Sequence, residues 1–173
     1  MFGLFAKKNK QQTGAELAEE GLKQISIAIK NKSIFLEKGR IFDDIYVHLD
    51  KPLGVPRTAY VVFSPSVQNQ VIARCVIIFD RVQDGIPTFQ IDWAVLPQYR
   101  KQNWGTTVAT KALTEFASGM GKAMPTGFHI EAVVDENNET SKKIARSLIG
   151  GEEILFNKQT QSNVHSFLKK FPA

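Results

Sequence analysis

The sequence predicts an α/β fold built on a mixed sheet, and three observations support this prediction. Residues 89–95 alternate apolar and polar side chains, which is the two-residue repeat of a strand. Residues 104–120 carry apolar side chains at every third or fourth position, as on one face of a helix. The predicted order of elements is helix, several strands, helix, strand, helix, strands, and this order is typical of helices packed on a mixed sheet.

The first predicted helix begins at Thr13 or Gly14 and ends within residues 30–33. The residues of its apolar face are Leu17, Leu22, Ile25 and Ile29. Residues 34–53 are ambiguous, because they fit either a short helix or a strand around residues 45–49.

Two β-rich strands are predicted next, at residues 57–63 and 71–79, and a polar turn joins them. Asp84-Gly85 is a hairpin signal, and it leads into the strand that begins at Phe89.

The predicted elements after the central helix are short and have polar or glycine-rich connections. They are a strand at 128–134, a capping turn at 135–138, a helix at 141–148 ended by Gly150-Gly151, a strand at 153–156, and a segment at 164–171 that fits either a strand or a helix.

Composition excludes several classes of protein. The chain has 173 residues, 43% of them hydrophobic, which predicts one domain at residues 13–173 after a flexible arm at residues 1–12. No apolar run approaches the length of a membrane span, and the opening lysines follow a short apolar patch, the reverse of a secretory signal. The single cysteine, Cys75, lies in an apolar run and has no internal disulfide partner. We therefore expect a cytoplasmic protein without membrane contact.

Charge gives little support to nucleic-acid binding. The net charge is +5, and Lys7, Lys8 and Lys10 supply three of these charges, which leaves +2 for the rest of the chain. The three histidines and the cysteine show no short-spaced ligand pairs, so no metal site is predicted.

The turn between the strand at 89–95 and the central helix has the properties of an anion site. It combines basic side chains, a glycine and a helix start whose first amides have no partner within the helix. These amides and the positive end of the helix dipole attract anions, and phosphate is the usual ligand. The alternative is a basic helix start without a ligand.

Two motifs in this half of the chain resemble the GNAT acyltransferases. The first, similar to their coenzyme A loop, is Val95-x-Pro97-x-Tyr99-Arg100 with Asn103-x-Gly105-Thr106. The second is Ile130-Glu131-Ala132-x-Val134 with Asn138-x-x-Ser141 and Ile144-Ala145. The second motif most resembles the branch that contains ribosomal-protein N-terminal acetyltransferases. The two motifs together cover roughly the second half of the chain.

The resemblance implies a mostly antiparallel mixed sheet with helices on both faces, in which the fourth and fifth strands, here those ending near Leu96 and Val134, splay apart. Acetyl-coenzyme A is the implied cofactor: its pantetheine arm enters the gap, and its pyrophosphate rests on the turn before the central helix. The implied cofactor-binding residues are Val95, Leu96, Arg100, Lys101, Gln102, Asn103, Trp104, Gly105, Thr106 and Asn138.

Two positions depart from the family pattern. Asn103 stands where the family usually has glycine, and asparagine tolerates a left-handed backbone better than other non-glycine residues. Ala145 stands where many members carry the tyrosine that protonates the departing thiolate. In the branch that this chain resembles, the serine of the second motif lies near the sulfur, so Ser141 is the candidate for that hydrogen bond. The alternative role of Ser141 is polarity at the helix start.

The implied reaction is direct transfer of an acetyl group to a primary amine, without a covalent enzyme intermediate. A strand amide near Val95 or Leu96 is expected to stabilise the developing oxyanion. Glu131 or Asp92 is the candidate base, with Glu131 preferred; the alternative for both is a solvated or ion-paired strand carboxylate.

We therefore interpret the chain as an acetyl-coenzyme A dependent N-acetyltransferase. The alternative is a catalytically weakened relative that binds acyl-coenzyme A or a protein partner without turnover. The acceptor is open between a small molecule and a protein N-terminus, with residues 34–53 expected to shape its pocket. A homodimer also stays open.

Overall fold

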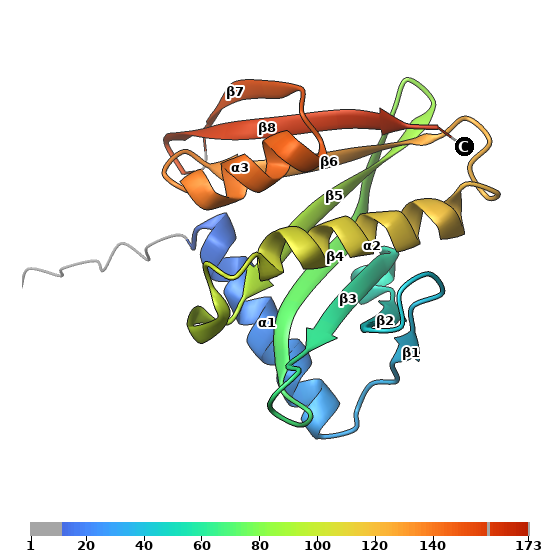
Figure 1. The fold of residues 1–173 in the computed structure, drawn as a ribbon. Helices are drawn as coiled ribbons and strands as arrows, with labels where there is room; N and C mark the ends of the chain where they lie inside the picture. Colours follow the sequence, from blue (N-terminus) through green and yellow to red (C-terminus); the bar gives the residue numbers. More distant parts are fainter. Residues whose placement is uncertain (1–11, 159, 173) are drawn as a thin grey trace, which may run out of the picture.

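The computed structural model describes residues 12–158 and 160–172, so residues 1–11 of the predicted arm lie outside the described residues. Eight strands form one sheet in the order β1-β2-β3-β4-β5-β6-β8-β7 (Figure 1). The strands are β1 (Glu37–Lys38), β2 (Ile45–Asp50), β3 (Arg57–Phe63), β4 (Val71–Gln83), β5 (Ile86–Val95), β6 (Phe128–Asp135), β7 (Glu152–Asn157) and β8 (Ser162–Phe171). Two 3-10 turns, η1 (Pro52–Gly54) and η2 (Pro97–Tyr99), interrupt the connections.

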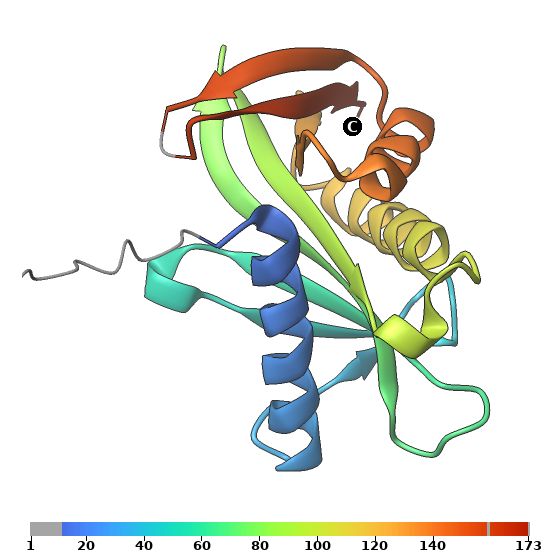
Figure 2. The ribbon, with the colours of Figure 1, turned by 90° about the vertical axis from the view of Figure 1, so that its left-hand side faces the viewer.

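Three helices cover the two faces of this sheet. α1 (Gly14–Lys30) lies on one face, and α2 (Trp104–Met120) with α3 (Glu139–Leu148) lies on the other (Figure 2). The predicted α/β architecture with helices on both faces is therefore confirmed.

The pairing of β5 with β6 is the exception within the sheet. All other neighbouring strands are antiparallel, whereas β5 and β6 are parallel and share only three residue pairs, Thr88 with His129, Phe89 with Ile130, and Gln90 with Glu131. Beyond these pairs the two strands diverge toward their carboxyl ends. This confirms the predicted splay, and β5 and β6 are the two strands that take part in it.

The space between the diverging ends of β5 and β6 is the β5–β6 gap. A cluster of aromatic rings lies at its closed end, where the two strands are still paired. Phe89 of β5 lies 5.0 Å from Phe116 of α2 and 6.1 Å from Phe128 of β6, measured between ring centres, in edge-to-face geometry. Phe116 and Phe128 are 5.4 Å apart. The packing holds α2 across both strands where they are still paired, so the gap opens beyond it.

The local signals of the sequence explain most element boundaries. Thr13 begins α1 with a capping box, in which its hydroxyl accepts from the amide of Glu16 and the Glu16 carboxylate accepts from the amide of Thr13. Asp84 and Gly85 have φ of 52° and 75°, as a two-residue hairpin between β4 and β5 requires. Both ambiguous segments are strands, β2 and β8.

Candidate functional site

The backbone of β5 presents polar groups to the gap. The amide of Leu96 donates to the carbonyl of Ile72 in β4 at 2.9 Å. Because successive residues of a strand point their amides to opposite sides, the amides of Trp93 and Val95 face away from β4, toward the gap. Leu96 is therefore wrong as the oxyanion donor, because its amide is already used within the sheet. Val95 keeps that role as a prediction.

The turn after β5 leaves a run of backbone amides without partners. Lys101 and Asn103 have left-handed backbones, with φ of 60° and 63°. Among the residues that the structure describes, none accepts a hydrogen bond from the amides of residues 102–106. Left-handed residues within such a turn direct neighbouring amides toward one side, which forms a concavity that suits an anion. The helix dipole of α2 adds partial positive charge at the same place.

Asn103 and Gly105 shape the corner between β5 and α2, formed by residues 101–106, in different ways. Asn103 takes the left-handed conformation that its place in the pattern requires, and its side chain makes no capping hydrogen bond. Gly105 lies within α2, and a Cβ there would stand 3.0 Å from Cδ1 of Ile144 and 3.7 Å from Cγ2 of Val95. The absence of a side chain at position 105 thus lets α3 approach α2 closely at the mouth of the gap.

Two other side chains predicted at the turn, those of Arg100 and Gln102, are engaged with the protein. Arg100 pairs with Glu19 of α1 and donates to the carbonyl of Val95 at 3.2 Å. The amide nitrogen of the Gln102 side chain donates to the carbonyl of Gln98 at 3.2 Å. Arg100 therefore links the turn to α1, and its charge is shared with a carboxylate.

Tyr99 anchors the turn from the opposite side, a role that the motif did not reveal. Its hydroxyl donates to Oε1 of Gln70 at 2.8 Å and lies 3.0 Å from Oγ of Ser64. Both partners belong to the loop between β3 and β4. The turn is thus held to two separate elements, which keeps its amides in place.

At the start of α3, Asn138 and Ser141 form a helix cap. Oδ1 of Asn138 accepts from the amide of Ser141 at 3.1 Å, so the side-chain oxygen of Asn138 is committed to the helix. Ser141 is half-buried, and within the described part of the chain no residue hydrogen-bonds to its hydroxyl. Ala145, one turn further on, is fully buried.

Both candidate carboxylates are ion-paired. Glu131 is buried, and its carboxylate accepts from Nη1 of Arg81 at 2.7 Å and from the hydroxyl of Ser166 at 2.9 Å. Asp92 accepts from Nη2 of Arg74 at 2.8 Å. Desolvation raises the pKa of Asp92, Arg74 opposes this, and the 50% exposure of the side chain limits the rise. The sequence favoured Glu131 as the base, but the geometry favours Asp92, because Asp92 is the more accessible carboxylate.

α1 lies beside the gap on the face opposite α2. The amide of Ala15 donates to Oδ2 of Asp135 at 3.4 Å, so the start of α1 sits at the carboxyl end of β6. Residues 34–53, expected to shape the acceptor pocket, instead form β1 and β2, which β3 and β4 separate from the gap. On this face α1, and not residues 34–53, therefore borders the gap.

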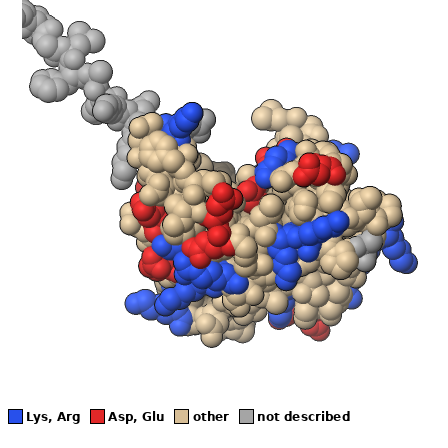
Figure 3. All heavy atoms as spheres, turned by 90° about the horizontal axis from the view of Figure 1, so that it is seen from above, with Lys and Arg blue, Asp and Glu red and all other residues tan. Residues whose placement is uncertain are grey.

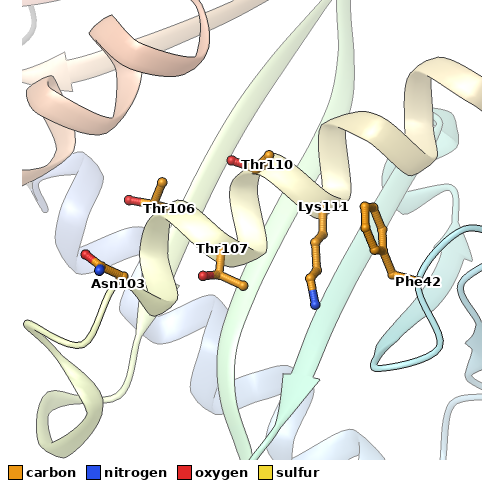
Figure 4. A pocket seen from close by; sticks show the side chains of 6 residues that line it. All are labelled: Phe42, Asn103, Thr106, Thr107, Thr110 and Lys111. Carbon is orange, nitrogen blue, oxygen red and sulfur yellow. The ribbon is translucent and has the colours of Figure 1, made fainter.

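A shallow groove with a volume of about 500 Å³ continues from the corner along α2 (Figure 4). Its lining residues are Phe42, Asn103, Thr106, Thr107, Thr110 and Lys111. Lys111 pairs with Asp44 and lies 5.3 Å from the ring centre of Phe42. Residues 107 and 111 are four apart, so helical spacing could have predicted the α2 wall of the groove. The wall formed by Phe42 could not be predicted in this way, because Phe42 comes from a loop that is distant in sequence.

That distant loop is held by a buried carboxylate of α2. Glu115 accepts hydrogen bonds from the amides of Arg40, Ile41 and Phe42 at 2.8–3.0 Å. Burial alone would raise the pKa of Glu115, but these three donors outweigh it and lower that pKa. Glu115 therefore fixes the wall of the groove and is not available for catalysis.

The charge distribution and the remaining polar clusters add no competing site. On the face in Figure 3, acidic and basic side chains lie side by side and do not form one continuous basic surface. Among residues 12–158 and 160–172, no group of three His, Cys, Asp or Glu side chains could hold a metal ion. Nor does any described helix have the length and apolarity to cross a membrane. Cys75 is fully buried, and burial raises the pKa of its thiol, so Cys75 is not a candidate nucleophile.

No protein-family model and no curated protein matches this sequence. Solved structures do match in fold. A GNAT-family acetyltransferase of Streptococcus pneumoniae superposes with a TM-score of 0.50 at 10% identity over 66% of each chain, slightly less than two-thirds of that protein. The ribosomal-protein-S5-alanine acetyltransferase of Vibrio fischeri has a TM-score of 0.50 at 14% identity, over 92% of this chain and 76% of its own. The splayed strands, the amide-lined turn and these superpositions agree: the chain has the GNAT acetyltransferase fold.

Proposed function

We propose that the protein is an acetyl-coenzyme A dependent N-acetyltransferase that acts on a primary amine. One observation carries this proposal: the unpartnered amides of residues 102–106 stand at the mouth of a gap that opens after only three pairs of parallel strands. A diphosphate suits the amides, and an extended, amide-containing arm suits an unpaired strand edge.

The residues present fit this cofactor in two places. The amides of residues 102–106 would hold the pyrophosphate, with Lys101 as a nearby positive charge. The amides of Trp93 and Val95, together with the outward-facing carbonyl of Trp93, would pair with the pantetheine arm, whereas the carbonyl of Val95 already accepts from Arg100. Bound acetyl-coenzyme A supplies the activated acetyl thioester.

The chemistry left to the protein is mainly alignment of two reactants. The amide of Val95 would donate to the acetyl carbonyl oxygen as negative charge develops there. The free hydroxyl of Ser141 would donate to the departing sulfur from the α3 side. Asp92, on the α1 face, would take a proton from the incoming amine directly or through water.

A second function is a module that binds acyl-coenzyme A, or a protein partner, without efficient turnover. The ion pair of Glu131 with Arg81 and the buried alanine at position 145 favour it, because both remove groups that could transfer protons. The binding half of the site does not depend on either residue.

Two measurements separate these functions. Thermal unfolding with and without acetyl-coenzyme A tests binding, and thiol release with peptide N-termini, polyamines and small amines tests transfer. We expect stabilisation and amine-dependent thiol release. Stabilisation without release across the panel would support the binding module, and no stabilisation would contradict both. DNA added as a control is expected to have no effect, since the described surface offers no basic face on the side seen in Figure 3.

A further inference from the structure

The two edges of the sheet differ in how they are protected. β1 forms one edge and has only two residues, whereas β7 forms the other edge with six residues. Within the described part of the chain, nothing pairs with the outer side of β7, which lies at the top in Figure 1. An unpaired strand of this length is a template for another strand.

The middle of β7 is apolar and exposed. The exposed fractions are 61% for Ile154, 42% for Leu155 and 60% for Phe156. Ile154 lies opposite His165 of β8 and Leu155 lies opposite Val164, so alternation places Ile154 and Phe156 on one face of the sheet and Leu155 on the other. Edge strands usually carry charges, proline or a bulge at such positions, and the middle of β7 has none of these.

We propose that β7 pairs with β7 of a second copy of the chain, in antiparallel orientation and centred on Leu155. Two copies of one strand are related by a twofold axis perpendicular to the sheet. Directly opposite residues of an antiparallel pair point to the same face. This restricts the twofold axis to registers centred on a residue.

Only one of these registers places every exposed apolar side chain of β7 opposite another apolar side chain. Centred on Leu155, it places Leu155 opposite Leu155 on one face and Ile154 opposite Phe156 on the other. At the ends, Lys158, the residue after β7, lies opposite Glu152, so opposite charges face each other beside the existing ion pair of Glu152 with Arg146. A shift of the centre to Ile154 would place Glu152 opposite Phe156, and a shift to Phe156 would place Ile154 opposite Lys158. Both shifts set a charge against an apolar side chain.

The pairing does not use the candidate site. β8 and β6 lie between β7 and the β5–β6 gap, so a second copy would extend the sheet away from the gap. The interface is therefore a property separate from acetyl transfer, and its test does not depend on cofactor binding.

The first experiment measures self-association by sedimentation velocity. Because one short strand makes a small interface, we expect dissociation constants in the range of about 1–100 μM. Leu155→Lys places two lysines opposite each other and should weaken association by at least about tenfold. The matched control is Leu49→Lys, because Leu49 is an exposed leucine (62%, against 42% for Leu155) in a strand near the other edge and should leave association unchanged. Circular dichroism checks that both variants fold.

The second experiment tests the register with cysteines. In Leu155→Cys the two cysteines are directly opposite, with Cα atoms about 4.5–5.5 Å apart, within disulfide range. In Ile154→Cys they are offset diagonally, about 7–8 Å apart, and should cross-link poorly. The native Cys75 is fully buried and does not interfere. A wild-type protein that stays monomeric up to about 200 μM, a Leu155→Lys dimer of unchanged strength, or equal cross-linking of the two cysteine variants would overturn the proposal.

Discussion

The two sides of the β5–β6 gap are built from different chemistry. On the α2 side the polar groups are backbone amides of residues 102–106, and the described residues give them no acceptor. On the α1 side the polar groups are carboxylates, and both candidate bases already have a cation: Asp92 has Arg74, and Glu131 has Arg81.

This difference indicates which half of the proposed reaction is better prepared. Backbone donors are fixed by the fold and bind an anion without further rearrangement. A carboxylate that is hydrogen-bonded to an arginine must first rearrange before it can take a proton from an amine. The structure therefore supports cofactor binding more strongly than proton removal, and the predictions below test each side.

The largest effect is expected from Gly105→Val on the α2 side. The new side chain would meet Ile144 and Val95 at the corner, so the affinity for acetyl-coenzyme A, measured by calorimetry, should fall by at least about a hundredfold. Gly119→Val is the matched control in the same helix, because a Cβ at Gly119 meets nothing within 4 Å. Unchanged affinity in a folded Gly105→Val protein would contradict the proposed corner.

On the α1 side, Asp92→Asn should lower kcat/KM for the amine by about thirtyfold, because a base is lost. In the wild type, activity should fall as the pH drops through the pKa of Asp92, which lies above that of an ordinary aspartate. This acidic limb should disappear in the variant. Glu131→Gln is the control, with a change of less than about twofold, since Arg81 already holds the Glu131 charge. A larger loss for Glu131→Gln than for Asp92→Asn would reverse the assignment.

Asn103 tests whether the backbone conformation of the turn matters. Asn103→Val should weaken acetyl-coenzyme A binding by about tenfold, because a β-branched residue is strained at a φ of 63°. Asn103→Gly keeps the conformation without a side chain and should bind at least as tightly as the wild type. The same calorimetric titration measures both, and equal affinities for the two variants would argue against a role for the left-handed turn.

The smallest effect is expected at Ser141, in the first turn of α3. Ser141→Ala should lower kcat by about fivefold with little change in cofactor affinity, because a hydrogen bond to the departing sulfur is made only during transfer. Ser147→Ala, on an exposed position of the same helix, is the control. If kcat is the same in both variants, Ser141 serves only the start of the helix.

Local sequence signals were sufficient for most of the fold. The switch of hydrophobic period around Pro97, the Asp84-Gly85 hairpin and the cap at Thr13 each depend on neighbouring residues, and each appears in the structure as predicted. The splay of β5 and β6 came instead from the family resemblance. Residues 34–53 and 164–171 stayed ambiguous because short apolar runs fit helix and strand equally well, and only pairing with neighbouring strands decides between them.

The sequence by itself determined the order of elements and the amide-rich turn before α2, because both follow from periodicity, glycine and capping over a few residues. Only the tertiary structure decided which carboxylates are engaged in ion pairs or hydrogen bonds. Arg81 is far from Glu131 in sequence, as Glu115 is from the loop around Phe42, and these contacts form only when the sheet and helices assemble. It also placed α1 beside the gap and β7 at the open edge, because strand order cannot be read from local pattern.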